Sequence, residues 1–203
     1  MSVMTIGDPE PRQRPLTVED LQRMPDDGRR YELVDGRLDV SPAPVFDHTR
    51  IEHRLAYHLE GCASEGFEVQ SGPGVNFNSE GTHHRIPDVA VFRAEDCGRP
   101  YCTRPPLLAV EVVSPESVIR DTHTKRAEYE RFGVESYWII NALADKIELL
   151  ELRLEAGVYR EVSQVFGMSL FETDAPFPVK FVPHWLVADG AWKTSIGGEQ
   201  GPG

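Results

Sequence analysis

The stretch LLAVEVV, residues 107–113, combines six apolar residues with a single acid, Glu111. A run this apolar predicts a β-strand that is buried on both faces of a sheet. A carboxylate in the middle of such a strand is costly to desolvate unless a cation or hydrogen bonds compensate for its charge. The segment therefore predicts a sheet whose centre contains one buried acid with a compensating partner.

A second acid, Asp88, opens the neighbouring apolar run DVAVF, residues 88–92, directly after Pro87. If the two predicted strands lie side by side, the carboxylates of Asp88 and Glu111 can face each other. Two converging buried carboxylates repel, and without a cation one of them stays protonated. A divalent cation between them would make an ordinary oxygen-ligand site, so we expect Asp88 and Glu111 to bind Mg²⁺ or Mn²⁺.

The lysine that often accompanies such a pair is absent from the strand. Alternate residues of a strand share a face, so an acid-x-lysine arrangement would need its lysine at position 113, where the sequence has Val113. The next predicted helix supplies a candidate, because Asp121, Lys125 and Tyr129 are spaced by four residues and form one stripe. If this stripe faces the sheet, the Lys125 ammonium can reach the position that Val113 leaves vacant.

Each of these residues also has a structural interpretation. Glu111 can be the ion-pair partner of an arginine, and Asp88 can simply begin a strand after a proline. Asp121 can cap the helix, a role that the sequence supports as well as a catalytic one. Lys125 can be a surface lysine paired with Asp121. The set of residues is more specific for a catalytic site than any one of its members.

Elements on either side complete a mixed α/β domain. Asp35-Gly36 suits a two-residue hairpin turn between strands 30–34 and 37–40, and Gly133 suits the C-terminal cap of a helix over 122–132. Further helices are predicted over 17–24 and 47–63, and further strands over 67–70, 75–78, 136–140, 146–154 and 159–165. This order predicts an α+β fold with helices packed on one curved sheet. We expect a single domain over 16–193, a disordered tail over 1–15 and a flexible tail over 194–203.

Composition narrows the class of protein. A hydrophobic fraction of 40% fits a soluble globular protein, and no stretch reaches the ~18 apolar residues of a membrane span. The N-terminus lacks the apolar region of a signal peptide, so we expect a cytoplasmic protein. The three cysteines, an odd number without CxxC spacing, argue against a disulfide framework and against a structural zinc site.

Histidine spacing gives no independent metal motif. His48, His53 and His58 lie five residues apart, a step of about 140° around a helix, so they do not share one face. No HExxH sequence occurs. His48, at the start of the long predicted helix, is expected either to contact the site or to serve a polar role at the helix start.

The formal net charge of −12 opposes binding to a phosphate backbone, since nucleic-acid-binding proteins usually carry a basic surface. The charge is unevenly distributed, however. Residues 83–131 contain eight basic and eight acidic residues, so the whole acidic excess lies outside this segment. A metal ion bound there would make the local charge positive.

The same residues carry a family resemblance. The blocks PDVAVF (87–92), VEVVSPES (110–117) and GVESYWII (133–140), with Asp121, Lys125 and Tyr129 between the last two, resemble the Uma family of restriction endonucleases. So does YELVDGRLDVSPAP (31–44), which is followed by His48 and a predicted helix. The resemblance covers roughly residues 16–154. It implies a restriction-endonuclease-like fold and membership of the PD-(D/E)XK nuclease superfamily.

The resemblance also implies roles for individual residues. Asp88 corresponds to the aspartate of the PD half, and Glu111 to the acid of the second half. Lys125 corresponds to the lysine, moved from the strand to the helix, while Glu32 corresponds to an acid that often serves as an auxiliary metal ligand. The departure from the superfamily pattern is Val113, which stands at the strand position of the lysine.

Two functions from different classes are compatible with these observations. The first is an endonuclease, dependent on Mg²⁺ or Mn²⁺, that hydrolyses phosphodiester bonds of DNA, with duplex DNA as the expected substrate. Cutting both strands needs two sites, which favours a homodimer. The second is a nuclease-like domain that binds nucleic acid or regulates, with weak or lost chemistry. The acidic surface favours the second hypothesis, and the intact set Asp88, Glu111 and Lys125 favours the first. A different metal-dependent hydrolase is a third possibility.

Overall fold

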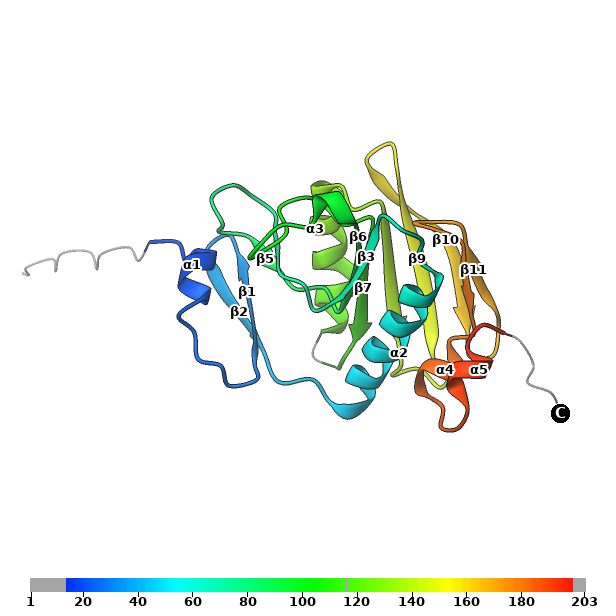
Figure 1. Cartoon of the computed structure of the whole chain (residues 1–203). Helices are drawn as coiled ribbons and strands as arrows, with labels where there is room; N and C mark the ends of the chain where they lie inside the picture. Colours follow the sequence, from blue (N-terminus) through cyan, green and yellow to red (C-terminus); the bar gives the residue numbers. More distant parts are fainter. Residues whose placement is uncertain (1–13, 116, 199–203) are drawn as a thin grey trace, which may run out of the picture.

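The computed structural model describes residues 14–115 and 117–198, and a six-stranded mixed sheet forms its centre (Figure 1). Strands β7 and β8 are parallel and the other neighbours are antiparallel. The strand order is β10 (Val158–Phe166), β9 (Glu148–Glu155), β8 (Ser136–Asn141), β7 (Leu108–Val113), β6 (Val89–Arg93) and β3 (Phe67–Ser71). The LLAVEVV stretch is therefore a central strand, as its apolar composition predicts.

Helices cover both faces of this sheet (Figure 1). Helix α2 (Phe46–Cys62) packs Ile51, Leu55 and Leu59 on one face, against a cluster that includes Val110 and Val112. Helix α3 (Lys125–Phe132), which continues from the π-helical turn η2 (Arg120–Thr124), packs on the other face. Because side chains alternate along β7, Glu111 points to the α3 side. The predicted class, a mixed sheet flanked by helices, is confirmed.

A second sheet contains the hairpin that the Asp35-Gly36 turn predicts. Both turn residues have positive φ angles, 51° and 76°, which a two-residue hairpin turn of this type requires. This sheet is ordered β2 (Arg37–Ser41), β1 (Arg30–Val34), β5 (His84–Arg85) and β4 (Val75–Asn76), with helix α1 (Val18–Leu21) beside it. The 3₁₀ turn η1 (Ala94–Asp96) follows β6.

The expectation of one curved sheet is wrong, because the described chain forms three sheets. Hairpin β1–β2 pairs with β5, through Leu33 and His84, and no strand of the central sheet pairs with it in the described residues. A further two-stranded sheet consists of β11 (Phe171–Thr173) and β12 (Val179–Phe181). Local sequence patterns predict strands, but tertiary packing decides which strands share a sheet.

The end of the described chain is packed rather than free. Helices α4 (His184–Val187) and α5 (Trp192–Ser195) lie beside α2, and Ile196 is only 2% exposed within the core cluster of α2. The packed part of the chain therefore continues beyond Thr194, where the flexible tail was expected to begin. Ile196 is one isolated apolar residue, which is a weak signal of burial in a sequence. The remaining tail, 199–203, and most of the expected N-terminal tail lie outside the described residues.

Among the described residues, helices are too short or too polar to traverse a lipid bilayer. The longest, α2, has 17 residues and carries charged side chains along its length.

Replacement of Ile196 tests whether the chain end is part of the core. Ile196→Ala removes buried apolar atoms and should lower the free energy of unfolding by about 2–5 kcal/mol. Urea denaturation of the two proteins measures this difference. Thr194→Ala, an exposed change in the same segment, is the matched control and should alter stability by less than about 1 kcal/mol. Equal stability of the Ile196 variant and the unmodified protein would contradict the packed chain end.

Candidate active site

Pairing of β6 with β7 brings the two predicted acids together. Val89 pairs with Val110, and the backbone N–H of Asp88 donates to the carbonyl of Val110 at 3.0 Å, so Asp88 stands directly opposite Glu111. Opposite residues of an antiparallel pair project to the same face. Both side chains are buried, with residue exposures of 1% for Asp88 and 2% for Glu111.

Asp88 is held by three donors from different elements. Its Oδ2 accepts the backbone N–H of Val112 at 2.7 Å and lies 3.2 Å from Nε2 of His48, while the guanidinium of Arg30 contacts its Oδ1. Burial alone would raise the pKa of Asp88, but the hydrogen bond from His48 and the charge of Arg30 outweigh it and lower the pKa to about 2. Asp88 is therefore ionised at neutral pH.

Glu111 has the opposite electrostatic state. Its Oε1 accepts hydrogen bonds from Nζ of Lys125 at 2.8 Å and from the hydroxyl of Tyr129 at 2.5 Å. Burial raises the pKa of Glu111, the Lys125 charge opposes this, and the carboxylates of Asp88, Asp121 and Glu32 add to it, giving a pKa of about 8. Without a bound cation, Glu111 is thus mainly protonated at neutral pH, as expected for converging buried acids.

The predicted stripe on the helix faces the sheet. Asp121, Lys125 and Tyr129 are each at most 2% exposed. Nζ of Lys125 lies 3.4 Å from Glu32 and 4.0 Å from Asp121, in addition to its bond to Glu111. Lys125 is therefore no surface lysine, and Asp121 lies within the π-helical turn rather than at the cap of α3. Four carboxylates hold the pKa of Lys125 above its usual range, although burial lowers it, so the ammonium stays charged.

Glu32 joins this site to a second buried ion-pair group. Its Oε1 accepts the backbone N–H of Ile86 at 2.7 Å, and its Oε2 accepts Nη1 of Arg85 at 3.2 Å. Arg85 is fully buried and binds both carboxylate oxygens of Glu128, at 2.7 and 2.9 Å. Both oxygens of Glu32 are thus engaged by protein groups, and its carboxylate holds Lys125 in place.

Sequence reasoning missed six charged residues of this network: Arg30, Asp39, Glu52, Arg85, Arg120 and Glu128. Glu52 lies one helical turn after His48, with 4.0 Å between its Oε2 and the imidazole Nδ1. Ligand atoms of His48, Glu52 and Asp88 lie within 4.8 Å of one another. The spacing of His48 and Glu52, four residues on one helix face, is the one signal that could have indicated Glu52.

The residues present fit a divalent cation. Ion pairs link seven carboxyl groups with four cationic arginine and lysine groups, and His48 and His83 contact three of the same acids. The carboxylates are Glu32, Asp39, Glu52, Asp88, Glu111, Asp121 and Glu128, and the cationic groups are Arg30, Arg85, Arg120 and Lys125. Asp121 Oδ1 is buried without a hydrogen-bond donor, and hydrogen bonds within the described chain reach only Oε1 of Glu111. Carboxylate oxygens that lack a hydrogen-bond donor suit a hard cation.

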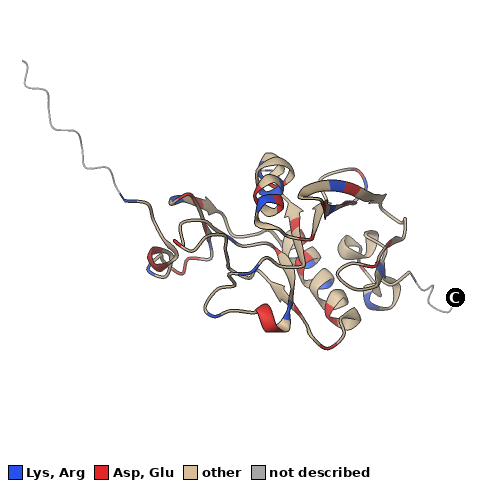
Figure 2. Ribbon diagram, turned by 90° about the horizontal axis from the view of Figure 1, so that it is seen from above, with Lys and Arg blue, Asp and Glu red and all other residues tan. Residues whose placement is uncertain are grey.

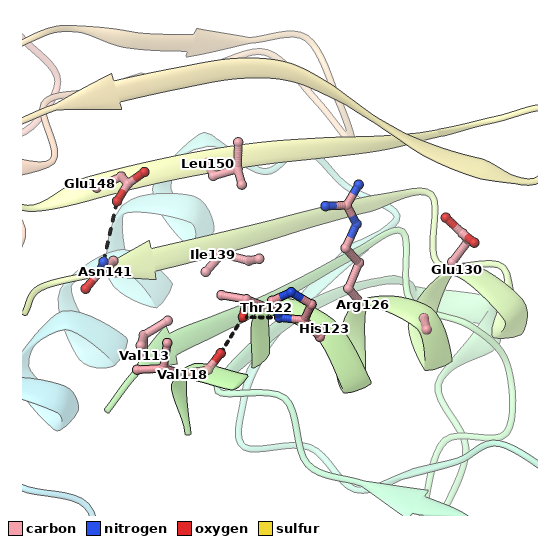
Figure 3. A pocket seen from close by; sticks show the side chains of 11 residues that line it. Val113, Val118, Thr122, His123, Arg126, Glu130, Ile139, Asn141, Glu148 and Leu150 are labelled. Carbon is pink, nitrogen blue, oxygen red and sulfur yellow. Dashed lines mark hydrogen bonds between the residues drawn. The ribbon is translucent and has the colours of Figure 1, made fainter. Parts of the chain in front are cut away.

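Solvent reaches the network at its edges, at Arg30, His48 and Glu52 and also at Asp39 and Arg120, whose side chains are 31% and 26% exposed. The side chains of Arg30, His48 and Glu52 are 21%, 13% and 15% exposed, whereas Asp88, Glu111 and Lys125 are at most 3% exposed. A pocket of about 440 Å³ between α3 and strands β8 and β9 is lined by Val113, His123 and Arg126 among others (Figure 3). None of the predicted catalytic residues lines this pocket.

The comparisons with known proteins define the class, a nuclease of the restriction-endonuclease type. Residues 18–183 match the model of the Uma2 family, described as "Putative restriction endonuclease", and the chain belongs to this family. A crystal structure from Anabaena variabilis, described as a putative nuclease belonging to DUF820, has a similar fold, with a TM-score of 0.59 at 16% sequence identity. The similarity covers 75% of this chain and 84% of that chain. No curated protein matches the sequence.

The protonation of Glu111 gives a pH-dependent prediction. Between about pH 4.5 and 8, Glu111 is protonated in the folded chain and ionised in the unfolded chain, so stability falls as pH rises. Glu111→Gln, which resembles the protonated form, should therefore gain stability over the unmodified protein across this window, by up to about 1.4 kcal/mol per pH unit.

Denaturation at several pH values in the presence of a chelator measures this difference. The matched control is Glu155→Gln, since Glu155 is exposed on β9. A stability difference between the Glu111 variant and the unmodified protein that stays constant from pH 5 to pH 8 would show that Glu111 is ionised throughout and contradict the prediction.

Proposed function

We propose that this protein is an endonuclease that depends on Mg²⁺ or Mn²⁺ and hydrolyses phosphodiester bonds of DNA. The observation that carries the proposal is the direct opposition of Asp88 and Glu111 on β6 and β7, with Lys125 bound to Glu111. Membership of the Uma2 family supports a nuclease. The donor set consists of carboxylates, which magnesium and manganese prefer.

Asp88 and Glu111 would hold the cation, with the carbonyl of Val112 beside them. When bound, a divalent cation supplies Lewis-acid polarisation of a phosphoryl oxygen and a water molecule of lowered pKa. To hold the cation, Glu111 would have to be ionised, so its protonated form would release the proton to solvent. His48 and the backbone N–H of Val112 keep the Asp88 carboxylate in a fixed orientation.

Lys125 supplies the positive charge next to the reacting phosphate. Its ammonium would orient the attacking water or stabilise charge that develops on the phosphate in the transition state. Glu32, Asp121 and Glu111 surround the ammonium, and Tyr129 donates to the same Glu111 oxygen, so Lys125 is held before substrate arrives. We therefore assign Glu32, Asp121 and Tyr129 the role of positioning residues.

The substrate and the assembly are part of the same proposal. A divalent cation at Asp88 and Glu111 would reduce the local acidic excess, which favours a polyanionic substrate despite the net charge of −12. Acidic and basic residues are interspersed along the described chain (Figure 2). We propose duplex DNA as substrate and a homodimer as the form that cuts both strands. We also propose that the protein acts in the cytoplasm.

A second function has one specific observation in its favour. Asp88 and Glu111 are nearly inaccessible and already paired with Arg30 and Lys125. A nuclease-like domain without hydrolytic activity, used for nucleic-acid binding or regulation, would have such a closed site. Binding of Mn²⁺ without hydrolysis of any DNA or RNA would favour this second function.

Loss of either acid should abolish activity. Asp88→Ala and Glu111→Ala remove the proposed ligands, so nicking of supercoiled plasmid with Mg²⁺ or Mn²⁺ should fall below detection for both variants. Glu60→Ala, which removes an exposed acid from α2, is the control and should nick at the unmodified rate. Nicking that survives in both the Asp88 and the Glu111 variants would end the proposal.

Loss of the lysine should affect the rate rather than the metal. Lys125→Met keeps Asp88 and Glu111 and should lower kcat by about 10²–10³-fold, a range typical for one group that stabilises transition-state charge. Affinity for Mn²⁺ should not decrease, because the change removes a positive charge. Lys146→Met, at an exposed position, serves as control. A Lys125→Met variant with an unchanged kcat would rule out this role for the ammonium.

A further inference from the structure

Arg30 lies between two acids at a partly exposed edge of the site. One guanidinium nitrogen, Nη1, contacts Oδ1 of Asp88, and the other, Nη2, lies 3.9 Å from Oε2 of Glu52. A single positive group therefore bridges two carboxylates that come from different elements, the start of β6 and the first part of α2. Among the described residues, Lys125 forms no ion pair with Asp88 or Glu52.

The same two acids belong to a set of groups with metal-ligand spacing. With His48, they present one nitrogen and two oxygen atoms within 4.8 Å of one another. An imidazole combined with carboxylates suits Mn²⁺ and other first-row divalent ions better than Mg²⁺, which prefers oxygen ligands and water. The guanidinium and a divalent ion compete for this position, because two cations a few ångströms apart repel.

The surroundings allow Arg30 to leave without disturbing Asp88. The Arg30 side chain is 21% exposed, and its contact to Glu52 is long. Asp88 keeps its two other partners, since Val112 N–H and His48 both contact Oδ2 rather than the oxygen that Arg30 holds. Departure of Arg30 therefore uncovers Oδ1 of Asp88 while the rest of the carboxylate stays in place.

We propose that Arg30 is an internal counter-ion that a divalent cation must displace from Asp88 and Glu52 in order to bind, and that Glu52 is a ligand of that cation. This inference rests on the proposed metal dependence. It explains how the ion-free protein tolerates a buried, ionised Asp88, because the guanidinium replaces the missing positive charge. It also predicts that Arg30 weakens metal binding.

The test is calorimetric titration of the purified protein with Mn²⁺ in the absence of DNA. Arg30→Gln removes the competing charge and should bind Mn²⁺ about tenfold more tightly than the unmodified protein. Arg29→Gln, the neighbouring and more exposed arginine that pairs with Asp27, is the matched control and should bind with unchanged affinity. Mn²⁺ should also raise the melting temperature of Arg30→Gln more than that of the unmodified protein.

Glu52→Gln is the second variant, and it keeps the inference testable if Arg30→Gln does not fold. Glu52 is partly exposed and makes only long contacts, so the fold should tolerate the change. Loss of one ligand should weaken Mn²⁺ binding by about tenfold. Unchanged affinity in Glu52→Gln, or unchanged or weaker affinity in a folded Arg30→Gln, would overturn the inference alone. Absence of Mn²⁺ binding in every variant and in the unmodified protein would overturn the proposed metal dependence as well.

Discussion

The site depends on the compensation of buried carboxylates by a limited number of cations. Asp88 and Glu111 must be desolvated because they lie where two apolar strands meet, and a buried charge without a partner is strongly destabilising. The protein compensates Asp88 with Arg30 and Glu111 with Lys125 and a proton. This arrangement pairs the buried acids within the protein and retains carboxylate oxygens that a divalent ion can use.

Strand β1 connects the two halves of this arrangement. Arg30 and Glu32 are two residues apart and so project from the same face of β1. Arg30 contacts Asp88, while Glu32 contacts Lys125. The four-stranded sheet that contains β1 thus places the Arg30 guanidinium against Asp88 and the Glu32 carboxylate against Lys125. This explains why hairpin β1–β2, although separate from the central sheet, belongs to the candidate site.

Sequence patterns predicted those site residues whose charge stands out from an apolar strand or whose spacing fits one face of a helix. Glu111 in an apolar strand, and the stripe of Asp121, Lys125 and Tyr129, were found because a buried charge or a helical spacing marks them. Arg30, Arg85 and Glu52 were not found, because charged residues in hairpins and on helices are normally solvated and their burial results from tertiary packing. Tertiary packing also explains why one sheet was predicted where three form, and why the domain was predicted to end before Ile196. The pairing of Leu33 with His84 and the burial of Ile196 both depend on residues far away in the sequence.

The central claim is that Asp88 and Glu111 bind one divalent cation together. Crystals soaked in Mn²⁺ and measured near the manganese absorption edge would locate the ion by its anomalous scattering. The account predicts a peak at roughly 2.1–2.3 Å from carboxylate oxygens of both residues, with the Arg30 guanidinium moved away from Asp88. A peak that touches neither acid, or none at a concentration at which the protein in solution binds Mn²⁺, would contradict it.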